Sequence, residues 1–282
     1  MNTPILGDAW IEDMRRYCRE LNIETGDLYN VLTDPKVAPM IRGKAFEFSV
    51  SLRLSRILPE DEWTVSKPIL NAQTGSHDVD VKVLHNQTER IISVECKLAG
   101  KGGFKISKGQ YVIPVKCMRS RTTKTPSKVK AGAKTLGVTH EAFLAHSDQY
   151  RTSHFDVVVT SLANAFYETD QETMTYVFQP SAAGEEFLRK LKPPPDVDLQ
   201  KFVYDKVYIA RAVDLAVSRE SGVACIKRAC KHKHDCGFIP NYPLINFGEV
   251  RDEESDTELV PINQWVEIDD ALPLFESFIE AS

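Results

Sequence analysis

The chain has 282 residues, of which 42% are hydrophobic and 27% charged, and its formal net charge at pH 7 is −5. These proportions are ordinary for a globular protein. No apolar run approaches the roughly 18 residues that span a bilayer, and the first residues lack the pattern of a secretory signal, so we expect a cytoplasmic protein with no membrane partner. In that reducing compartment the six cysteines are expected to be thiols or metal ligands rather than disulfides.

The first 58 residues predict helices. Apolar side chains recur at helical spacing over 8–22, a second short helix is expected at 26–32, and a longer one runs from Val37 to Leu58, just before Pro59. Glu47 lies in the long helix, on or near its buried side. A strand at 63–65 then leads toward the centre of the chain.

Two runs of alternating apolar residues, 79–83 and 91–96, are separated by a polar segment and predict two strands joined by a turn. Side chains alternate along a strand, so Asp78 and Asp80 share one face of the first, and Glu95 and Lys97 share one face of the second. If those faces coincide, carboxylates and an ammonium group converge. Carboxylate oxygens suit Mg²⁺, and the lysine could hold or help deprotonate a water molecule. The pattern indicates metal-assisted hydrolysis of a phosphodiester; the alternative is a surface hairpin whose charges face water.

At these residues the chain resembles the PD-(D/E)xK nuclease superfamily, best known from restriction endonucleases. Glu95-Cys96-Lys97 matches the E-x-K half of the motif and Asp78 or Asp80 matches the upstream aspartate, while His77 stands where the family has its proline. The resemblance implies an α/β fold with a mixed central sheet flanked by helices. It also implies that Asp80 and Glu95, with Asp78 as an alternative, bind Mg²⁺ or Mn²⁺, and that Lys97 positions or activates the hydrolytic water. Glu47 is a possible further metal ligand, or else a surface glutamate on a helix rim.

The function that this resemblance implies is a Mg²⁺-dependent, sequence-specific endonuclease acting on double-stranded DNA. A prokaryotic type II restriction enzyme is the expected kind, working as a homodimer and leaving 5′-phosphates. Two alternatives stay open. One is another nuclease of the superfamily, acting in modification-dependent restriction, repair or junction resolution. The other is a nucleic-acid-binding protein without catalysis.

The segment 97–134 is strongly basic: it contains eleven lysines and arginines, and no Asp or Glu occurs between Cys96 and His140. The rest of the chain therefore carries −16, that is −5 minus 11. The basic residues are interleaved with small polar residues and two aromatic ones, and such a composition suits contact with a phosphate backbone. A run of charges can also be a solvated face. The candidate DNA-binding residues are Lys101, Lys105, Lys108, Lys116, Arg119 and Arg121.

Beyond this segment, 128–136 and 140–150 predict two helices joined by a turn, which resembles a helix-turn-helix element only weakly. The apolar run 155–162 predicts a buried central strand paired with a strand at 175–178. A capped helix is expected at 181–191 and another strand at 201–210. The prolines at 193–195 are the best linker candidate. We therefore expect a nuclease core over 1–192, including the N-terminal helices and the basic segment, and a C-terminal region over 196–282 packed on or appended to it.

Cysteines and histidines gather in the C-terminal region. Three thiols and two imidazoles lie within the twelve residues from Cys225 to Cys236. Tetrahedral zinc takes such ligands at short spacing, and the candidate ligands of a structural Zn²⁺ are Cys225, Cys230, His234 and Cys236. The spacing differs from the separated C-x₂-C pairs of most structural zinc sites, and a basic surface loop is the alternative interpretation.

Overall fold

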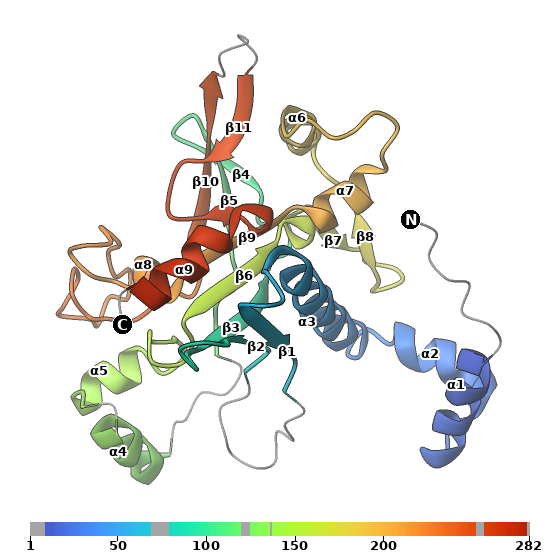
Figure 1. Cartoon of the computed structure of the whole chain (residues 1–282), viewed down its shortest axis with the longest axis horizontal. Helices are drawn as coiled ribbons and strands as arrows, with labels where there is room; N and C mark the ends of the chain where they lie inside the picture. The colour runs from blue at the N-terminus through green and yellow to red at the C-terminus, as the bar shows by residue number, and fades with distance from the viewer. Residues whose placement is uncertain (1–8, 69–78, 120–124, 136, 252–256, 281–282) are drawn as a thin grey trace.

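A computed structural model describes residues 9–68, 79–119, 125–135, 137–251 and 257–280. It is a mixed α/β structure built on a six-stranded sheet (Figure 1). In spatial order the strands are β1 (Trp63–Ser66), β2 (Val81–His85), β3 (Ile91–Leu98), β6 (Val157–Ser161), β9 (Val207–Arg211) and β12 (Val266–Glu267). The pair β3–β6 is parallel and the other neighbours are antiparallel. The predictions of a mixed central sheet and of its strands near 79–83, 91–96 and 155–162 are confirmed.

Three helices precede the sheet, as predicted: α1 (Ala9–Glu20), α2 (Leu28–Thr33) and α3 (Ala38–Ile57). In Figure 1, α1 and α2 extend away from the body of the molecule, whereas α3 lies along β1, β2 and β3. Proline stands in the first turn of α3, where its missing N–H removes no intrahelical hydrogen bond. The buried residues Phe46, Val50 and Leu54 recur every four positions and so share the face toward the sheet.

The sheet face under α3 carries one hydrophobic core, which the last helix completes. Val157 and Val159 of β6 point into this core, whereas Val158 points into the core on the other face. The C-terminal helix α9 (Leu272–Glu280) adds Phe275, which is fully buried. Its ring packs edge-on against Trp63 of β1, with 5.9 Å between the ring centres. The α3–β1 region and the C-terminal helix therefore share one core.

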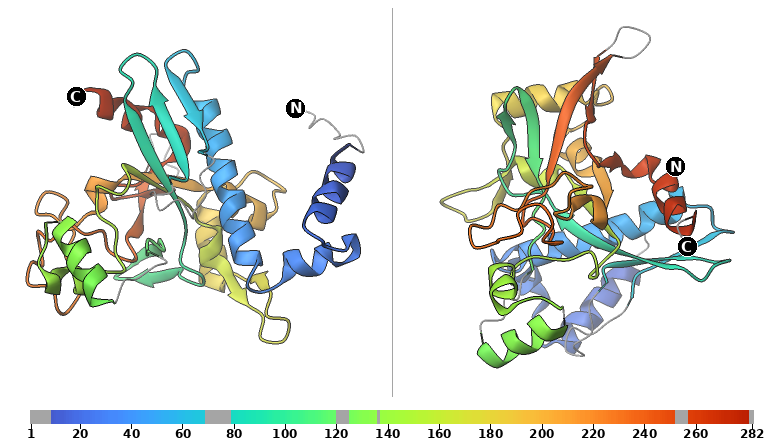
Figure 2. Two further views of the ribbon diagram at one scale, coloured as in Figure 1. Left: turned by 90° about the horizontal axis from the view of Figure 1, so that it is seen from below. Right: turned by 90° about the vertical axis from the view of Figure 1, so that its left-hand side faces the viewer.

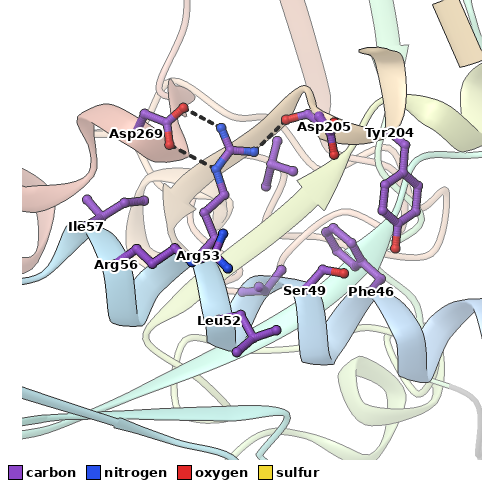
Figure 3. A pocket seen from close by; sticks show the side chains of 11 residues that line it. Phe46, Ser49, Leu52, Arg53, Arg56, Ile57, Tyr204, Asp205 and Asp269 are labelled. Carbon is purple, nitrogen blue, oxygen red and sulfur yellow. Dashed lines mark hydrogen bonds and ion pairs between the residues drawn. The ribbon is translucent and has the colours of Figure 1, made fainter. Parts of the chain in front are cut away.

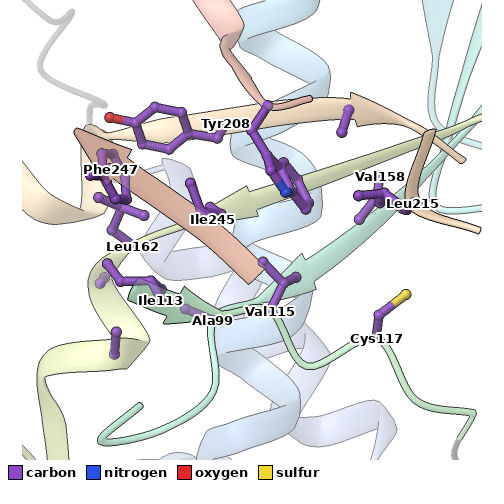
Figure 4. Packing of buried hydrophobic residues seen from close by; sticks show 14 of the residues in the cluster. Ala99, Ile113, Val115, Cys117, Val158, Leu162, Tyr208, Leu215, Ile245 and Phe247 are labelled. Carbon is purple, nitrogen blue, oxygen red and sulfur yellow. The ribbon is translucent and has the colours of Figure 1, made fainter. Parts of the chain in front are cut away.

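The opposite face packs against a second sheet and two helices. This sheet has four strands in the order β11 (Thr257–Pro261), β10 (Leu244–Arg251), β5 (Gln110–Pro114) and β4 (Lys105–Ser107). With α6 (Ala182–Lys190) and α7 (Leu199–Asp205), it encloses a core in which Val158, Tyr208 and Phe247 lie together (Figure 4).

The strand predicted at 175–178 forms with a different partner, and the one predicted at 201–210 is a helix in its first half. The strand β8 (Tyr176–Phe178) pairs with β7 (Tyr167–Thr169) in a separate two-stranded sheet, because both sides of β6 are already taken by β3 and β9. Over 201–210 the chain is helical through Asp205, and β9 begins only at Val207. The side chain of Asp198 starts that helix by accepting the N–H of Gln200 at 2.9 Å.

The chain after residue 196 is continuous with the core. It supplies β9 and β12 to the six-stranded sheet and β10 and β11 to the four-stranded one. Arg53 of α3 also links α3 to this part of the chain. Its guanidinium donates two hydrogen bonds to the carboxylate of Asp269 and one to the backbone carbonyl of Asp205 (Figure 3). The expected boundary at 193–195 thus falls within one packed unit.

The basic segment leads into two short helices, α4 (Pro126–Thr135) and α5 (His140–Ala145). The second helix ends earlier than predicted, and the chain then runs irregularly to β6. Figure 2 shows this helix pair beside the loop that follows α8 (Ala212–Leu215). No helix in these described ranges is long and apolar enough to cross a membrane.

Candidate metal and nucleic-acid site

Asp80 meets the E-x-K segment through the pairing of β2 with β3. Val81 lies opposite Val94, so extending this antiparallel register by one residue places Asp80 opposite Glu95. The Oδ2 atom of Asp80 accepts the backbone N–H of Cys96 at 2.8 Å. This bond holds the aspartate against the middle of the segment 95–97. The alternative aspartate, Asp78, lies outside the described residues.

Glu95 and Lys97 form an ion pair on one face of β3, and Tyr150 contacts both. The hydroxyl of Tyr150 donates to Oε1 of Glu95 at 3.1 Å. The Nζ atom of Lys97 lies 5.3 Å from the centre of the Tyr150 ring. Glu95 is only 8% exposed, so its charge is compensated by these contacts more than by water.

Glu47 supplies a third carboxylate from α3. It is 8% exposed and accepts hydrogen bonds from Lys44, at 2.9 Å, and from Lys67. Its charge raises the pKa of Asp80, so the two carboxylates lie close enough to interact. The structure therefore places Glu47 inside the protein, near Asp80, and not on an exposed helix rim.

The electrostatics of the cluster formed by Asp80, Glu95 and Glu47 favour binding of a further cation. Burial, followed by the charges of Glu95 and Glu47, raises the pKa of Asp80 to about 7. Burial opposes the charge on Lys97, but the acidic groups around it, Glu95 first among them, together outweigh burial and hold the pKa of Lys97 well above its ordinary value. Lys97 is thus an ammonium group at neutral pH, while Asp80 is poised to gain or lose a proton. A divalent cation beside Asp80 would replace that proton.

A cavity of about 680 Å³ adjoins these side chains, and Glu47 and Lys97 line it. Its wall also contains three other cationic side chains, Arg42, Lys101 and Lys116. Rings of the β7–β8 hairpin hold two of them: the guanidinium carbon of Arg42 lies 4.2 Å from the centre of the Tyr167 ring, and Nζ of Lys101 lies 5.3 Å from that of Tyr176. Cationic walls beside carboxylates suit a bound phosphodiester backbone.

The six predicted DNA-binding residues separate into two sets in the structure. Lys101 and Lys116 line the cavity. Lys105 on β4 and Lys108 in the β4–β5 turn are exposed but are not among its lining residues. Arg119 is partly exposed near α5, with its backbone N–H bound to the carbonyl of Asp148 at 3.1 Å. Arg121 lies outside the described residues.

The predicted cysteines come together, but with a different histidine. Ligand atoms of His146, Cys225, Cys230 and Cys236 all lie within 4.8 Å of one another, which makes a possible metal-binding cluster compatible with zinc. His234 is exposed and is not part of it. Across the described part of the chain this is the only such cluster of His, Cys, Asp and Glu; the carboxylates near Asp80 do not form so tight a group.

Four residues of these two sites are absent from the sequence-based predictions: Arg42, Lys67, Tyr150 and His146. Each reaches its partner through tertiary contacts rather than through a local pattern. For Lys67 and Arg42, the positive charge near the predicted helix and strand was the only available signal. For Tyr150 and His146, the pattern of polar and apolar residues gave no indication of a role in either site.

Comparison of the chain with protein-family models, with curated protein sequences and with solved structures finds no match in any of the three.

Proposed function

We propose that this protein is a Mg²⁺-dependent endonuclease that hydrolyses phosphodiester bonds of double-stranded DNA, with a core of the PD-(D/E)xK, restriction endonuclease-like kind. The observation that carries the proposal is the contact of Asp80 with the segment 95–97, which joins the two halves of the motif. The cationic cavity beside Lys97 supports a polyanionic substrate.

Asp80 and Glu95 are the proposed ligands of Mg²⁺, or of Mn²⁺ in its place. Magnesium typically takes one or two protein carboxylates and keeps several waters, so a tighter cage of ligands is not required. Bound there, the ion would polarise the phosphate and lower the pKa of a water molecule. Glu47 adds negative charge that acts on Asp80. Zinc, in contrast, suits the sulfur-rich cluster around Cys230, where its role would be structural.

Lys97 acts in this proposal as a donor of hydrogen bonds and of positive charge. With its pKa held above the ordinary value by Glu95, the ammonium keeps its proton at neutral pH. It would therefore hold the attacking water or the scissile phosphate, and stabilise the charge that develops on the phosphate oxygens. Tyr150 keeps Glu95 oriented through its hydroxyl.

The proposal extends to sequence specificity and to a homodimer, as in type II restriction enzymes. Cleaving both strands at one position needs two active sites, and a two-fold symmetric pair of chains presents them to a palindromic target.

Incubation of plasmid or phage DNA with the protein and Mg²⁺, with and without EDTA, tests the activity. Discrete fragments are expected with the metal and intact DNA without it. Lys97→Ala should abolish the fragments, whereas Lys105→Ala, a lysine of the same basic segment outside the cavity, should keep them.

Three outcomes would change the proposal. A smear in place of fragments would indicate a nuclease without sequence specificity. DNA binding with no cleavage in Mg²⁺ or Mn²⁺ would indicate a binding protein. Cleavage by Lys97→Ala at the wild-type rate would show that this motif is not the active site.

A further inference from the structure

The Cys/His cluster stands apart from the carboxylate site and has its own architecture. His146 directly follows α5 as its C-cap, and the three cysteines come from the loop after α8. We propose that His146, Cys225, Cys230 and Cys236 bind one zinc ion tetrahedrally, and that His146 does so through Nε2. This inference does not depend on nuclease activity.

The orientation of His146 supports Nε2 as the ligand atom. The amide nitrogen of Gln149 donates to the carbonyl of Ile239 at 2.9 Å, which turns the amide oxygen toward Nδ1 of His146. Because that oxygen only accepts, Nδ1 carries the proton of the neutral imidazole and Nε2 keeps a lone pair. His146 is 1% exposed, and its Nε2 has no hydrogen-bond partner within the described residues. A buried ring nitrogen without a hydrogen-bond partner destabilises the folded protein unless something binds it.

Metal-ligating histidines almost always donate their other ring nitrogen to an oxygen, which orients the ring. Gln149 provides that oxygen here. The ring of Phe238 stacks on His146, with 4.3 Å between the ring centres and 7° between the planes, and holds it from the side. The imidazole is therefore fixed before any ion arrives.

The sulfur atoms are positioned by the loop itself. The backbone N–H of Cys225 donates to the carbonyl of Lys233 at 2.7 Å, and that of Cys230 donates to the carbonyl of Lys227 at 3.0 Å. Three thiolates and one imidazole are a usual ligand set for structural zinc. Bonds of about 2.3 Å to a tetrahedral ion imply about 3.8 Å between ligand atoms, so the present separations of up to 4.8 Å need only small side-chain movements.

An ion can reach this position from solvent. A cavity of about 570 Å³ extends to the cluster, and its lining includes His146, Cys230 and Cys236. The opposite wall is formed by the turn between α4 and α5. Zinc would thus fasten α5 to the loop after α8, next to the ion pair of Lys227 with Asp148 at 2.7 Å.

Metal analysis of purified protein tests the site. The full chain is produced with zinc in the medium, purified without chelator, and its metal is measured by elemental analysis. About one zinc per chain is expected for the wild type, well under half of that for His146→Ala and for Cys230→Ser, and the wild-type amount for the matched variant His234→Ala. Cobalt in place of zinc should give the strong visible absorption of a tetrahedral thiolate site in wild type and His234→Ala.

If His146→Ala or Cys230→Ser does not fold, the wild-type protein alone still tests whether zinc is bound by the cluster. A mercurial thiol reagent should then release about one zinc per chain as the cluster thiols react. Folded wild-type protein with reduced cysteines and neither zinc nor cobalt binding would overturn the proposal. Loss of zinc in His234→Ala with retention in a folded His146→Ala would overturn the assignment of the fourth ligand.

Discussion

Asp80, a proposed metal ligand, opposes folding of the metal-free protein once its carboxyl group is ionised. Its pKa is about 7 in the folded protein, against an ordinary value of 3.8. Between these values the folded chain binds more protons than the unfolded chain, so the free energy of unfolding falls as the pH rises through this range. Above pH 7 the ionised carboxylate remains buried beside Glu95 and Glu47 and costs stability in the metal-free protein.

Asp80→Asn should therefore stabilise the metal-free protein at pH 8 and do so much less at pH 5, where only part of the loss has occurred. Asparagine keeps an oxygen for the N–H of Cys96 but carries no charge. The gain at pH 8 is expected to exceed that at pH 5 by about 3 kcal/mol, since about two pKa units separate pH 5 from the folded-state pKa of about 7 and one unit corresponds to about 1.4 kcal/mol. Urea unfolding in EDTA at both pH values measures it, and a gain that does not depend on pH would contradict the electrostatic origin.

Tyr150 offers a second test at the scale of one residue. Tyr150→Phe removes the hydroxyl that orients Glu95 and keeps the ring beneath Lys97. Removing such a supporting hydrogen bond typically weakens metal binding or activity by about 10- to 100-fold. The Mg²⁺ concentration for half-maximal cleavage should rise by about tenfold or more.

The control for this change is Tyr111→Phe. The Tyr111 hydroxyl contacts Lys190 and Glu186, away from the carboxylates, so the same loss of an oxygen should leave the Mg²⁺ dependence unchanged. An equal shift in both variants would indicate a general loss of stability, and no shift in Tyr150→Phe would remove Tyr150 from the site.

At the scale of elements, local patterns predict much of the framework. The alternation in 79–83 and 91–96 predicts β2 and β3, and helical spacing predicts α1 and α3. The predictions fail where a local pattern fits two structures equally well, or where residues that meet in the fold are far apart in the sequence. The apolar pair Phe202 and Val203 fits a strand or a buried helix face equally well. His146 lies 79 positions before Cys225, so no spacing rule connects it with the cysteines.

Lysines of the basic segment lie in two places, the cavity wall and the β4–β5 hairpin, and their contributions to DNA binding can be measured separately. Lys101 and Lys116 line the cavity, and neutralising both should make the logarithm of the DNA-binding constant less dependent on salt, by about 0.9 slope units for each lost phosphate contact. Fluorescence anisotropy of a labelled duplex in Ca²⁺, across a salt series, gives the slope for Lys101→Ala/Lys116→Ala.

Lys105→Ala/Lys108→Ala is the matched control, with the same change of charge on the β4–β5 hairpin. We expect its salt slope to stay near that of the wild type. The opposite result, a shallower slope only in this second pair, would place the DNA along the hairpin instead of across the cavity.

At the scale of the whole molecule, the α3–β1 region and α9 stabilise each other. Phe275→Ala should lower the free energy of unfolding by about 3–5 kcal/mol, the usual cost of truncating a buried phenylalanine, because the ring is fully buried against Trp63. Urea unfolding measures the loss. Leu52→Ala, a large apolar residue of α3 that is 59% exposed, should change it by about 0.5 kcal/mol or less. Equal losses would mean that α9 is not part of this core.

The late position of β12 and α9 has a consequence for how the protein is made. Until these elements leave the ribosome, β9 is an open sheet edge, and the core beneath α3 lacks Ile268 and Phe275. Domains tend to fold as units during synthesis, and exposed edges of unfinished sheets invite pairing with other chains. We therefore expect the nascent chain to reach its native state only once β12 and α9 have left the ribosome, and chaperones that shield apolar surface to raise its yield more than slower translation does.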